Sequence, residues 1–175
     1  MKGIYMDIES KQKLEKLKKE SKRKAAQKQL IEDLKNWFQI DISSCIFANY
    51  QISDDIRLAV YEKIRLKDIK KEKFYYEPNV ANEKLKMVIN KFITFENRQI
   101  LVYPSTHAYF SIRGDHLYIE FPIAVVSSIK ECKGIVFKLM HETHNDLIIV
   151  EENLNYGLVI SEDEYEYVSI EYWGV

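Results

Sequence analysis

Glycine, proline and cysteine are scarce in this chain of 175 residues, which contains 5, 3 and 2 of them respectively. So few turn-forming residues argue against long flexible linkers, and they predict that most of the chain lies in regular secondary structure. The two cysteines, Cys45 and Cys132, are far apart and form no CxxC motif. We therefore expect two reduced thiols in the interior rather than a disulfide or a cysteine-based metal site.

Long apolar runs are missing as well. No stretch of 18 apolar residues is present, so we expect no membrane-spanning helix. The N-terminal segment lacks the apolar core of a secretory signal, and the expected location is the cytoplasm. A glycine-rich phosphate loop is absent too, and so is the alternation of strands and helices that is typical of nucleotide-binding sheets.

Basic residues are missing from the C-terminal end. Nine carboxylates and no Lys or Arg follow Lys138, whereas the first 40 residues carry eleven Lys or Arg against six Asp or Glu. The formal net charge of −1 therefore conceals a basic end and an acidic end. Such asymmetry bears on the partners of a protein and not on its fold. Lysine outnumbers arginine by 21 to 5, which is typical of an AT-rich genome of a bacterium or a phage.

The residues that are abundant in the first half predict helices. Residues 7–40 are rich in strong helix formers and should form one long helix, and residues 1–28 are expected to form an extension that projects from the domain. A second helix is predicted to start at Ser53, with the lysine-rich segment 67–73 closing it or forming a turn. A third should follow Pro78. The apolar spacing that supports the first and third helices comes from Leu30, Ile31, Leu34, Trp37, Phe38, Leu85, Val88, Ile89 and Phe92.

From residue 95 the apolar period changes to two, which is typical of strands. Strand-like segments lie at 98–103, 108–112, 116–121, 135–140, 146–151, 156–160 and 165–173. The sequence also predicts a hairpin at Arg113-Gly114-Asp115 and a short helix at 123–132 that ends at Gly134. The expected fold is α+β: one domain over 1–175, with a helical part at 29–94 packed on an antiparallel sheet of about five to six strands at 95–175.

The C-terminal hairpin is the first candidate site. Val168, Ile170 and Tyr172 should face the core, because side chains alternate along a strand. The opposite face would then expose aromatic rings beside an acidic turn, a combination suited to binding a basic partner. An ordinary solvated sheet face with aromatic cross-strand pairs is the alternative. The expected contact residues are Glu162, Asp163, Glu164, Tyr165, Tyr167, Glu171 and Trp173.

The N-terminal helix is the second candidate site, because its lysines could lie along a phosphate backbone. It also carries Glu9, Glu15 and Glu20, and a helix of mixed sign is usually just a solvated face. Its basic residues are Lys11, Lys13, Lys16, Lys18, Lys19, Lys22, Arg23, Lys24 and Lys28.

The third candidate is the cluster from His141 to Asp146, which holds two histidines three residues apart and could bind zinc in a turn. A polar turn with solvated histidines is the alternative, and we assign no metal, cofactor or catalytic residue.

In composition the chain resembles bacterial immunity proteins and antitoxins. That resemblance carries no motif, but it implies a non-enzymatic inhibitor whose acidic, aromatic sheet blocks a basic partner such as a nuclease toxin. The alternatives are a nucleic-acid-associated protein that uses the N-terminal helix and a small metal-dependent enzyme.

Overall fold

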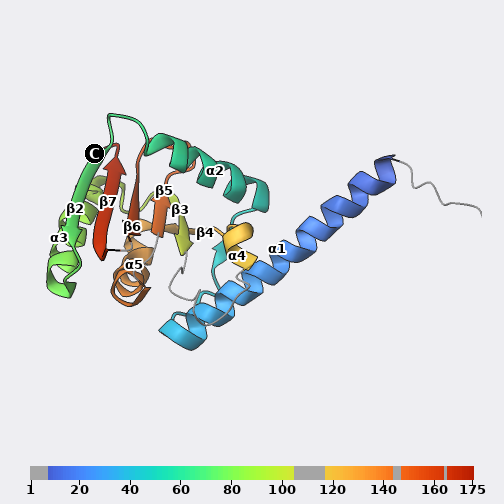
Figure 1. Cartoon of the computed structure of the whole chain (residues 1–175), viewed down its shortest axis with the longest axis horizontal. Coiled ribbons are helices and arrows are strands. Elements are labelled where there is room, and N and C mark those ends of the chain that lie inside the picture. Colours follow the sequence, from blue (N-terminus) through green and yellow to red (C-terminus); the bar gives the residue numbers. More distant parts are fainter. Residues whose placement is uncertain (1–7, 105–116, 144–146, 164) are drawn as a thin grey trace, which may run out of the picture.

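An antiparallel sheet with the strand order β1-β4-β3-β5-β6-β7-β2 forms the centre of the molecule (Figure 1). This computed structural model describes residues 8–104, 117–143, 147–163 and 165–175. The strands are β1 (Ile46–Phe47), β2 (Lys70–Tyr75), β3 (Gln99–Pro104), β4 (Val125–Ser128), β5 (Leu147–Val150), β6 (Gly157–Glu162) and β7 (Tyr167–Trp173). The helices are α1 (Ile8–Phe38), α2 (Tyr50–Lys63), α3 (Pro78–Lys91), α4 (Leu117–Glu120) and α5 (Ile129–Thr143), with a 3-10 turn at Ile93–Phe95.

Helices cover both faces of the sheet. On one face, α1, α3 and α5 pack against alternate residues of the strands, such as Ile149 and Ile170, and form a buried core with them. On the other face α2 packs Val60 against a second cluster that includes Ile148, Val159 and Trp173. Because both faces are buried, the central strand β5 is apolar at every position, from Leu147 to Val150.

The long helix α1 has two different halves. From Ala26 onward it carries the buried side chains Leu30, Leu34 and Phe38, whereas residues 10–19 are exposed. Figure 1 shows the first half extending away from the body, at the end of the molecule opposite to β2 and β7. Residues 10–18 therefore have helix propensity but no packing partner in the described part of the chain.

The α+β class is confirmed, and the sheet has seven strands where about five to six were expected. The predicted periods of α1 and α3, and of the strands β3, β5, β6 and β7, are correct. In α3 the side chains Leu85, Val88, Ile89 and Phe92 are all buried. Within the described ranges, no helix is both long and apolar enough to cross a lipid bilayer.

Several local predictions are wrong. Helix α2 begins at Tyr50, because the side chain of Asn49, and not that of Ser53, caps it by accepting from the Ile52 N–H at 3.0 Å. Residues 135–140 belong to α5 and not to a strand, since this helix continues through Gly134, where an added Cβ would meet nothing within 4 Å. Segment 125–128 is the strand β4 and not a helix, and Leu117–Glu120 is a helical turn and not a strand.

Two edge strands were not predicted at all. Residues 67–73 are predicted to close the second helix or to form a turn, but Lys70–Tyr75 form strand β2. Its lysines are typical of exposed edges, where charge discourages pairing with other chains. Strand β1 has only two residues and pairs with β4. The predicted strand at 108–112 and the hairpin at Arg113-Gly114-Asp115 lie outside the described residues.

Candidate functional site

The C-terminal hairpin is joined by β2 to form one continuous surface at the edge of the sheet. Directly opposite pairs across β2 and β7 are Lys71–Glu171, Lys73–Ser169 and Tyr75–Tyr167. Because directly opposite residues share a face, these side chains form two adjacent rows on the α2 side of the sheet. Helix α2 covers the Trp173 end of these rows, and the end with Tyr75 and Tyr167 is exposed.

The expectation that Trp173 faces solvent is wrong. Its side chain is 4% exposed, and its indole Nε1 donates a hydrogen bond to the Leu154 carbonyl at 2.8 Å. The ring also lies so close to Gly157 that an added Cβ there would come within 2.6 Å of the ring. The predicted alternation of β7 is right, but a second helix layer covers this end of the face, so that Trp173 belongs to the core.

Glu171 is not a free carboxylate either. Its side chain is largely buried and forms an ion pair with Lys71 at 2.6 Å. The expected open acidic face is therefore neutralised along β7 by the lysines of the neighbouring strand. This pairing was not predicted, because the prediction placed Lys71 in a turn.

Asp163 organises the β6–β7 turn. Its Oδ1 accepts the backbone N–H groups of Tyr165 and Tyr167, both at 3.0 Å, and its Oδ2 forms an ion pair with Lys73 at 2.9 Å. The Lys73 ammonium and the Tyr167 N–H hold the pKa of the Asp163 carboxyl below its ordinary value. Asp163 is thus a structural residue of the turn, in the manner of an Asx turn.

Three tyrosines are exposed around this turn. Tyr165 is 69% exposed, Tyr75 51% and Tyr167 42%. The rings of Tyr75 and Tyr167 meet edge to face at 5.7 Å, and the Lys73 ammonium lies 5.0 Å from the centre of the Tyr167 ring. We call the group formed by Tyr75, Tyr165, Tyr167, Lys73, Asp163 and Glu166 the tyrosine tip.

Glu166 ties β2 to the turn. Its carboxylate accepts the hydroxyl of Tyr75, and its backbone carbonyl accepts the Tyr76 N–H at 2.8 Å. The hydrogen bond to Glu166 is the main reason that the pKa of Tyr75 is raised above its ordinary value. Glu166 has a φ of 64°, a left-handed backbone conformation that residues other than glycine rarely adopt. The tip therefore has a defined conformation, held by contacts from two strands.

The tip is more negative than positive. Asp163 and Glu166 belong to it. Burial raises the pKa of Tyr76 and the charge of Glu162 adds to that effect, and the charge of Glu77 adds a small part to the raised pKa of Tyr75, which is chiefly due to Glu166. Lys73 is the cation within the tip. The remaining carboxylate of the predicted site, Glu164, lies outside the described residues. The acidic character that was expected over the whole hairpin is thus concentrated at its turn.

Sequence reasoning placed Tyr165, Tyr167, Glu162 and Asp163 correctly in one region and missed Tyr75, Lys73 and Glu166. A signal for Tyr75 was available, since Phe74 and Tyr76 are two residues apart and flank Tyr75, as on the buried face of a half-buried strand. No local pattern, however, could show that β2 (Lys70–Tyr75) pairs with β7 (Tyr167–Trp173), which is far away in the sequence.

The structure removes one residue, Arg23, from the candidate nucleic-acid site on the N-terminal helix. The lysines of the projecting half, from Lys11 to Lys18, are exposed, as a solvated or phosphate-binding face requires. Arg23 is instead buried against α2. It is therefore not available to a phosphate backbone.

The remaining candidates give little support for catalysis. Burial raises the pKa of the Cys132 thiol to about 12 and also raises that of Cys45, so neither is an activated nucleophile. His141 lies in the last turn of α5 and not in a loop, while His144 and Asp146 lie outside the described ranges. Among the side chains that the structure places, no group of three or more His, Cys, Asp or Glu is positioned to hold a metal.

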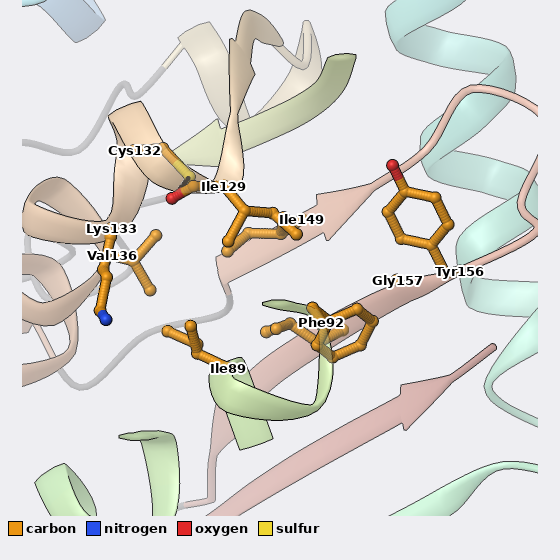
Figure 2. Close-up of a pocket in the computed structure, with 10 residues that line it drawn as sticks. Ile89, Phe92, Ile129, Cys132, Lys133, Val136, Ile149, Tyr156 and Gly157 are labelled. Carbon is orange, nitrogen blue, oxygen red and sulfur yellow. Dashed lines mark hydrogen bonds between the residues drawn. The ribbon is translucent and has the colours of Figure 1, made fainter. Parts of the chain in front are cut away.

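An apolar cavity between α3, α5 and the sheet is too small for a substrate. Ile89 and Phe92 line it from the α3 side, and Cys132 and Val136 line it from α5 (Figure 2). Its volume is about 10 Å³, which is the space of about one water molecule. Tyr156 also borders it, and the hydroxyl of that buried side chain has no hydrogen-bond partner among the residues that the structure describes.

No protein-family model, curated protein or solved structure matches the chain. The function therefore has to be argued from these surfaces alone.

Proposed function

We propose that this protein is a non-enzymatic binding protein that inhibits a partner with a basic surface, as immunity proteins and antitoxins do. In this proposal it acts in the cytoplasm of a bacterium. The tyrosine tip makes the contact, and the partner is a protein with a cationic site, such as a nuclease toxin. Occupation of that site by the tip excludes the nucleic acid.

The observation that carries the proposal is the exposure of three tyrosines on a turn held by Asp163 and Glu166. Tyrosine provides a large contact area with little rotational freedom to lose, and it is enriched among the residues that dominate binding energy. Here the conformation of the turn is defined before any partner binds. A preorganised contact loses less entropy on binding than a flexible one.

The charge of the tip supports a basic partner. Carboxylates around the tyrosines would accelerate the encounter with a cationic surface, and salt would weaken that effect. Compared with the sequence prediction, the proposed contact set loses Trp173 and Glu171 and gains Tyr75 and Glu166. Asp163 contributes indirectly, by holding the turn.

The test uses two matched variants as bait in extracts of the native host. Tyr165→Ser combined with Tyr167→Ser removes exposed rings from the tip, whereas Leu58→Ser combined with Leu66→Ser removes exposed apolar side chains elsewhere. A basic protein that the wild type and the Leu58/Leu66 variant retain, and that the tip variant loses, would support the proposal. Equal capture by all three proteins would refute the role of the tip.

The charge component is tested on the captured partner. Glu166→Gly removes a carboxylate at a position where glycine adopts the left-handed backbone without cost. We expect slower association and a weaker dependence of the association rate on salt, and faster dissociation as well, because Tyr75 loses the hydrogen bond that holds it to the turn. An association rate that does not depend on salt in the wild type would contradict a basic partner.

The exposed lysines of the projecting half of α1 favour a second candidate, binding of nucleic acid. Because Arg23 and Ala26 are packed, the informative deletion is residues 1–18, which leaves the packed half of the helix intact. Loss of oligonucleotide binding in that variant, measured by fluorescence polarisation at two salt concentrations, would support this function. No binding by the full chain at low salt would exclude it.

A further inference from the structure

The outer edge of β2 is one end of the sheet and has no neighbouring strand. The Tyr76 N–H donates to the Glu166 carbonyl at 2.8 Å, and this pair continues the register of β2 with β7. Because backbone groups alternate sides along an antiparallel strand, those of Lys71, Lys73 and Tyr75 point away from β7. Within the described ranges, none of these three residues has a backbone hydrogen bond. Each therefore offers one N–H and one C=O to a further strand.

The lysines at the outward-pointing positions do not protect this edge. Free lysines commonly do so, because their charge repels a second strand. Here Lys71 forms an ion pair with Glu171 at 2.6 Å. Lys73 forms one with Asp163 at 2.9 Å. Both ammonium groups are therefore drawn toward β7 and its turn, and their charge is neutralised within the chain.

Helix α3 exposes apolar side chains beside the same edge, and Figure 1 shows α3 and β2 together at one end of the molecule. Lys84 of α3 forms an ion pair with Glu72 of β2 at 3.0 Å, so this flank of the helix lies toward β2. Val80 and Met87 are 37% and 42% exposed, and their helical spacing from Lys84 places them on the same flank. The three side chains line a shallow hollow of about 560 Å³.

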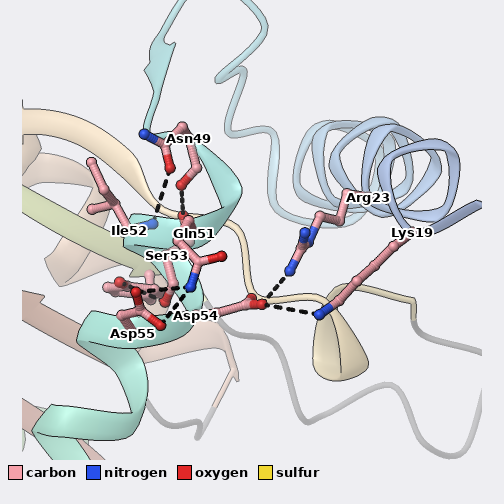
Figure 3. Close-up of polar contacts among 9 residues, drawn as sticks. Lys19, Arg23, Asn49, Gln51, Ile52, Ser53, Asp54 and Asp55 are labelled. Carbon is pink, nitrogen blue, oxygen red and sulfur yellow. Dashed lines mark hydrogen bonds and ion pairs between the residues drawn. The ribbon is translucent and has the colours of Figure 1, made fainter. Parts of the chain in front are cut away.

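The strand at the other end of the sheet offers much less. Strand β1 has only two residues, and α1 runs beside it, since Arg23 of α1 and Phe47 of β1 line the same hollow. Nη2 of Arg23 donates to Asp54 of α2 and so holds α1 at this end of the sheet (Figure 3). A further strand therefore finds exposed backbone at β2 and not at β1.

We propose that β2 pairs with β2 of a second copy of this chain, in the antiparallel direction, so that two sheets join into one. The two-fold axis passes through Phe74, perpendicular to the sheet, and residues on the same face then lie opposite each other. Lys73 lies opposite Tyr75 of the second copy, and Lys71 lies opposite its Glu77. Glu77 is still in an extended conformation, with φ −136° and ψ 128°, so the strand reaches this pair.

Charge selects this register over its neighbours. An axis at Lys73 or at Glu72 would place that charged residue directly opposite itself, and like charges in that position destabilise a sheet. An axis at Tyr75 would move Lys71 opposite Asn79, which already belongs to α3. The axis at Phe74 avoids both problems and sets opposite charges against each other at each end of the contact.

The dimer uses both exposed features of this edge. Lys73 and Tyr75 of each copy exchange backbone hydrogen bonds with the other, and the axis brings the two α3 flanks with Val80 and Met87 toward each other. It also places the two tyrosine tips on one face of the joined sheet. The dimer goes beyond the proposed function and does not depend on it.

Sedimentation analysis of the full chain tests the dimer. We expect a monomer–dimer equilibrium with a dissociation constant of about 10–100 µM, which is typical of a small contact. Lys73→Pro removes the outward N–H, and a proline is tolerated on the solvent side of an edge strand. Lys73→Met is the matched control, because it loses the same ion pair but keeps the N–H. The proline variant should dimerise at least about tenfold more weakly than the control. Equal dimerisation of both variants, or a wild type that is monomeric at about 1 mM, would overturn the proposal.

Charge reversal tests the same contact without changing the strand. Glu77→Lys sets like charges opposite Lys71 and should weaken the dimer by about fivefold or more. Glu62→Lys, at an exposed position of α2, makes the same change of net charge away from the contact and should dimerise like the wild type. Equal effects of the two reversals would contradict the register.

Oxidation of cysteine variants tests the register independently. Position 74 faces its own copy in a pair without hydrogen bonds, where the Cα atoms are about 4.5 Å apart and a disulfide can form. Phe74→Cys should therefore yield a covalent dimer under mild oxidation. Glu72→Cys, on the same face of β2, should stay monomeric, and the wild type gives the background from Cys45 and Cys132. A covalent dimer from position 72 and none from position 74 would refute the proposed pairing.

Discussion

Replacing Trp173 by alanine separates the two accounts of the C-terminal hairpin. If Trp173 were a solvent-exposed contact residue, its truncation would change the free energy of unfolding by no more than about 0.5 kcal/mol. In the structure the side chain is 4% exposed, packs over Gly157 and donates to the Leu154 carbonyl. Loss of a buried tryptophan costs about 3–5 kcal/mol, so we expect a loss of about 4 kcal/mol.

Urea unfolding followed by circular dichroism measures this change without depending on tryptophan fluorescence. With a slope of about 2 kcal/mol per molar urea, a loss of about 4 kcal/mol lowers the midpoint by about 2 M. Tyr165→Ala, at an exposed position of the same hairpin, is the control and should leave the midpoint nearly unchanged. A Trp173→Ala protein that loses less than about 1 kcal/mol would refute the burial of this side chain under α2.

Three further predictions follow from particular contacts. The pKa of Asp163 is lowered in the folded state, chiefly by Lys73. The ion pair therefore stabilises the fold at pH values above the pKa of this carboxyl in the unfolded chain, and the stabilisation is lost as the pH falls through its pKa in the folded protein. Lys73→Met should therefore be less stable than the wild type at pH 7, and the difference should shrink as the pH falls below the ordinary pKa of this carboxyl; a difference that does not change with pH would contradict the pairing. Tyr156→Phe removes a buried hydroxyl without a partner in the described ranges, so urea unfolding should show an unchanged or higher stability, and a loss above about 1 kcal/mol would show that the hydroxyl is satisfied. Deletion of residues 1–18 should reduce the helical signal in circular dichroism and change the free energy of unfolding by less than about 0.5 kcal/mol, whereas a larger loss would mean that the projecting half packs on the body.

Periodic patterns predicted the elements that are buried on one or both faces. The spacing of Leu85, Val88 and Ile89 identified α3, and the alternation of residues 165–173 identified β7. The same signal was present in α5, where Ile129, Cys132, Val136 and Leu139 recur at helical spacing, but Gly134 was taken to end the helix. A glycine on the exposed side of a helix costs only about 1 kcal/mol, and the packing of α5 outweighs that cost.

The candidate site was predicted only in part, for a topological reason. The turn from Glu162 to Tyr167 is local in sequence, and its acids and tyrosines could be recognised there. The contribution of β2 depends on a pairing between distant segments, and the burial of Trp173 depends on α2 lying across the second face of the sheet. Neither the pairing with β2 nor the position of α2 can be predicted from the residues of the hairpin itself.

Site-specific photo-crosslinking in cells of the native host tests the role of the tyrosine tip most directly. A photoreactive phenylalanine analogue replaces Tyr165 in one protein and, in the control, Leu58, which has a similar exposure of 64% on α2. The proposed function predicts that position 165 yields a crosslink to one protein of basic charge, and that position 58 does not. Crosslinks to the same protein from both positions, or none from position 165, would contradict the assignment of the tip as the binding surface.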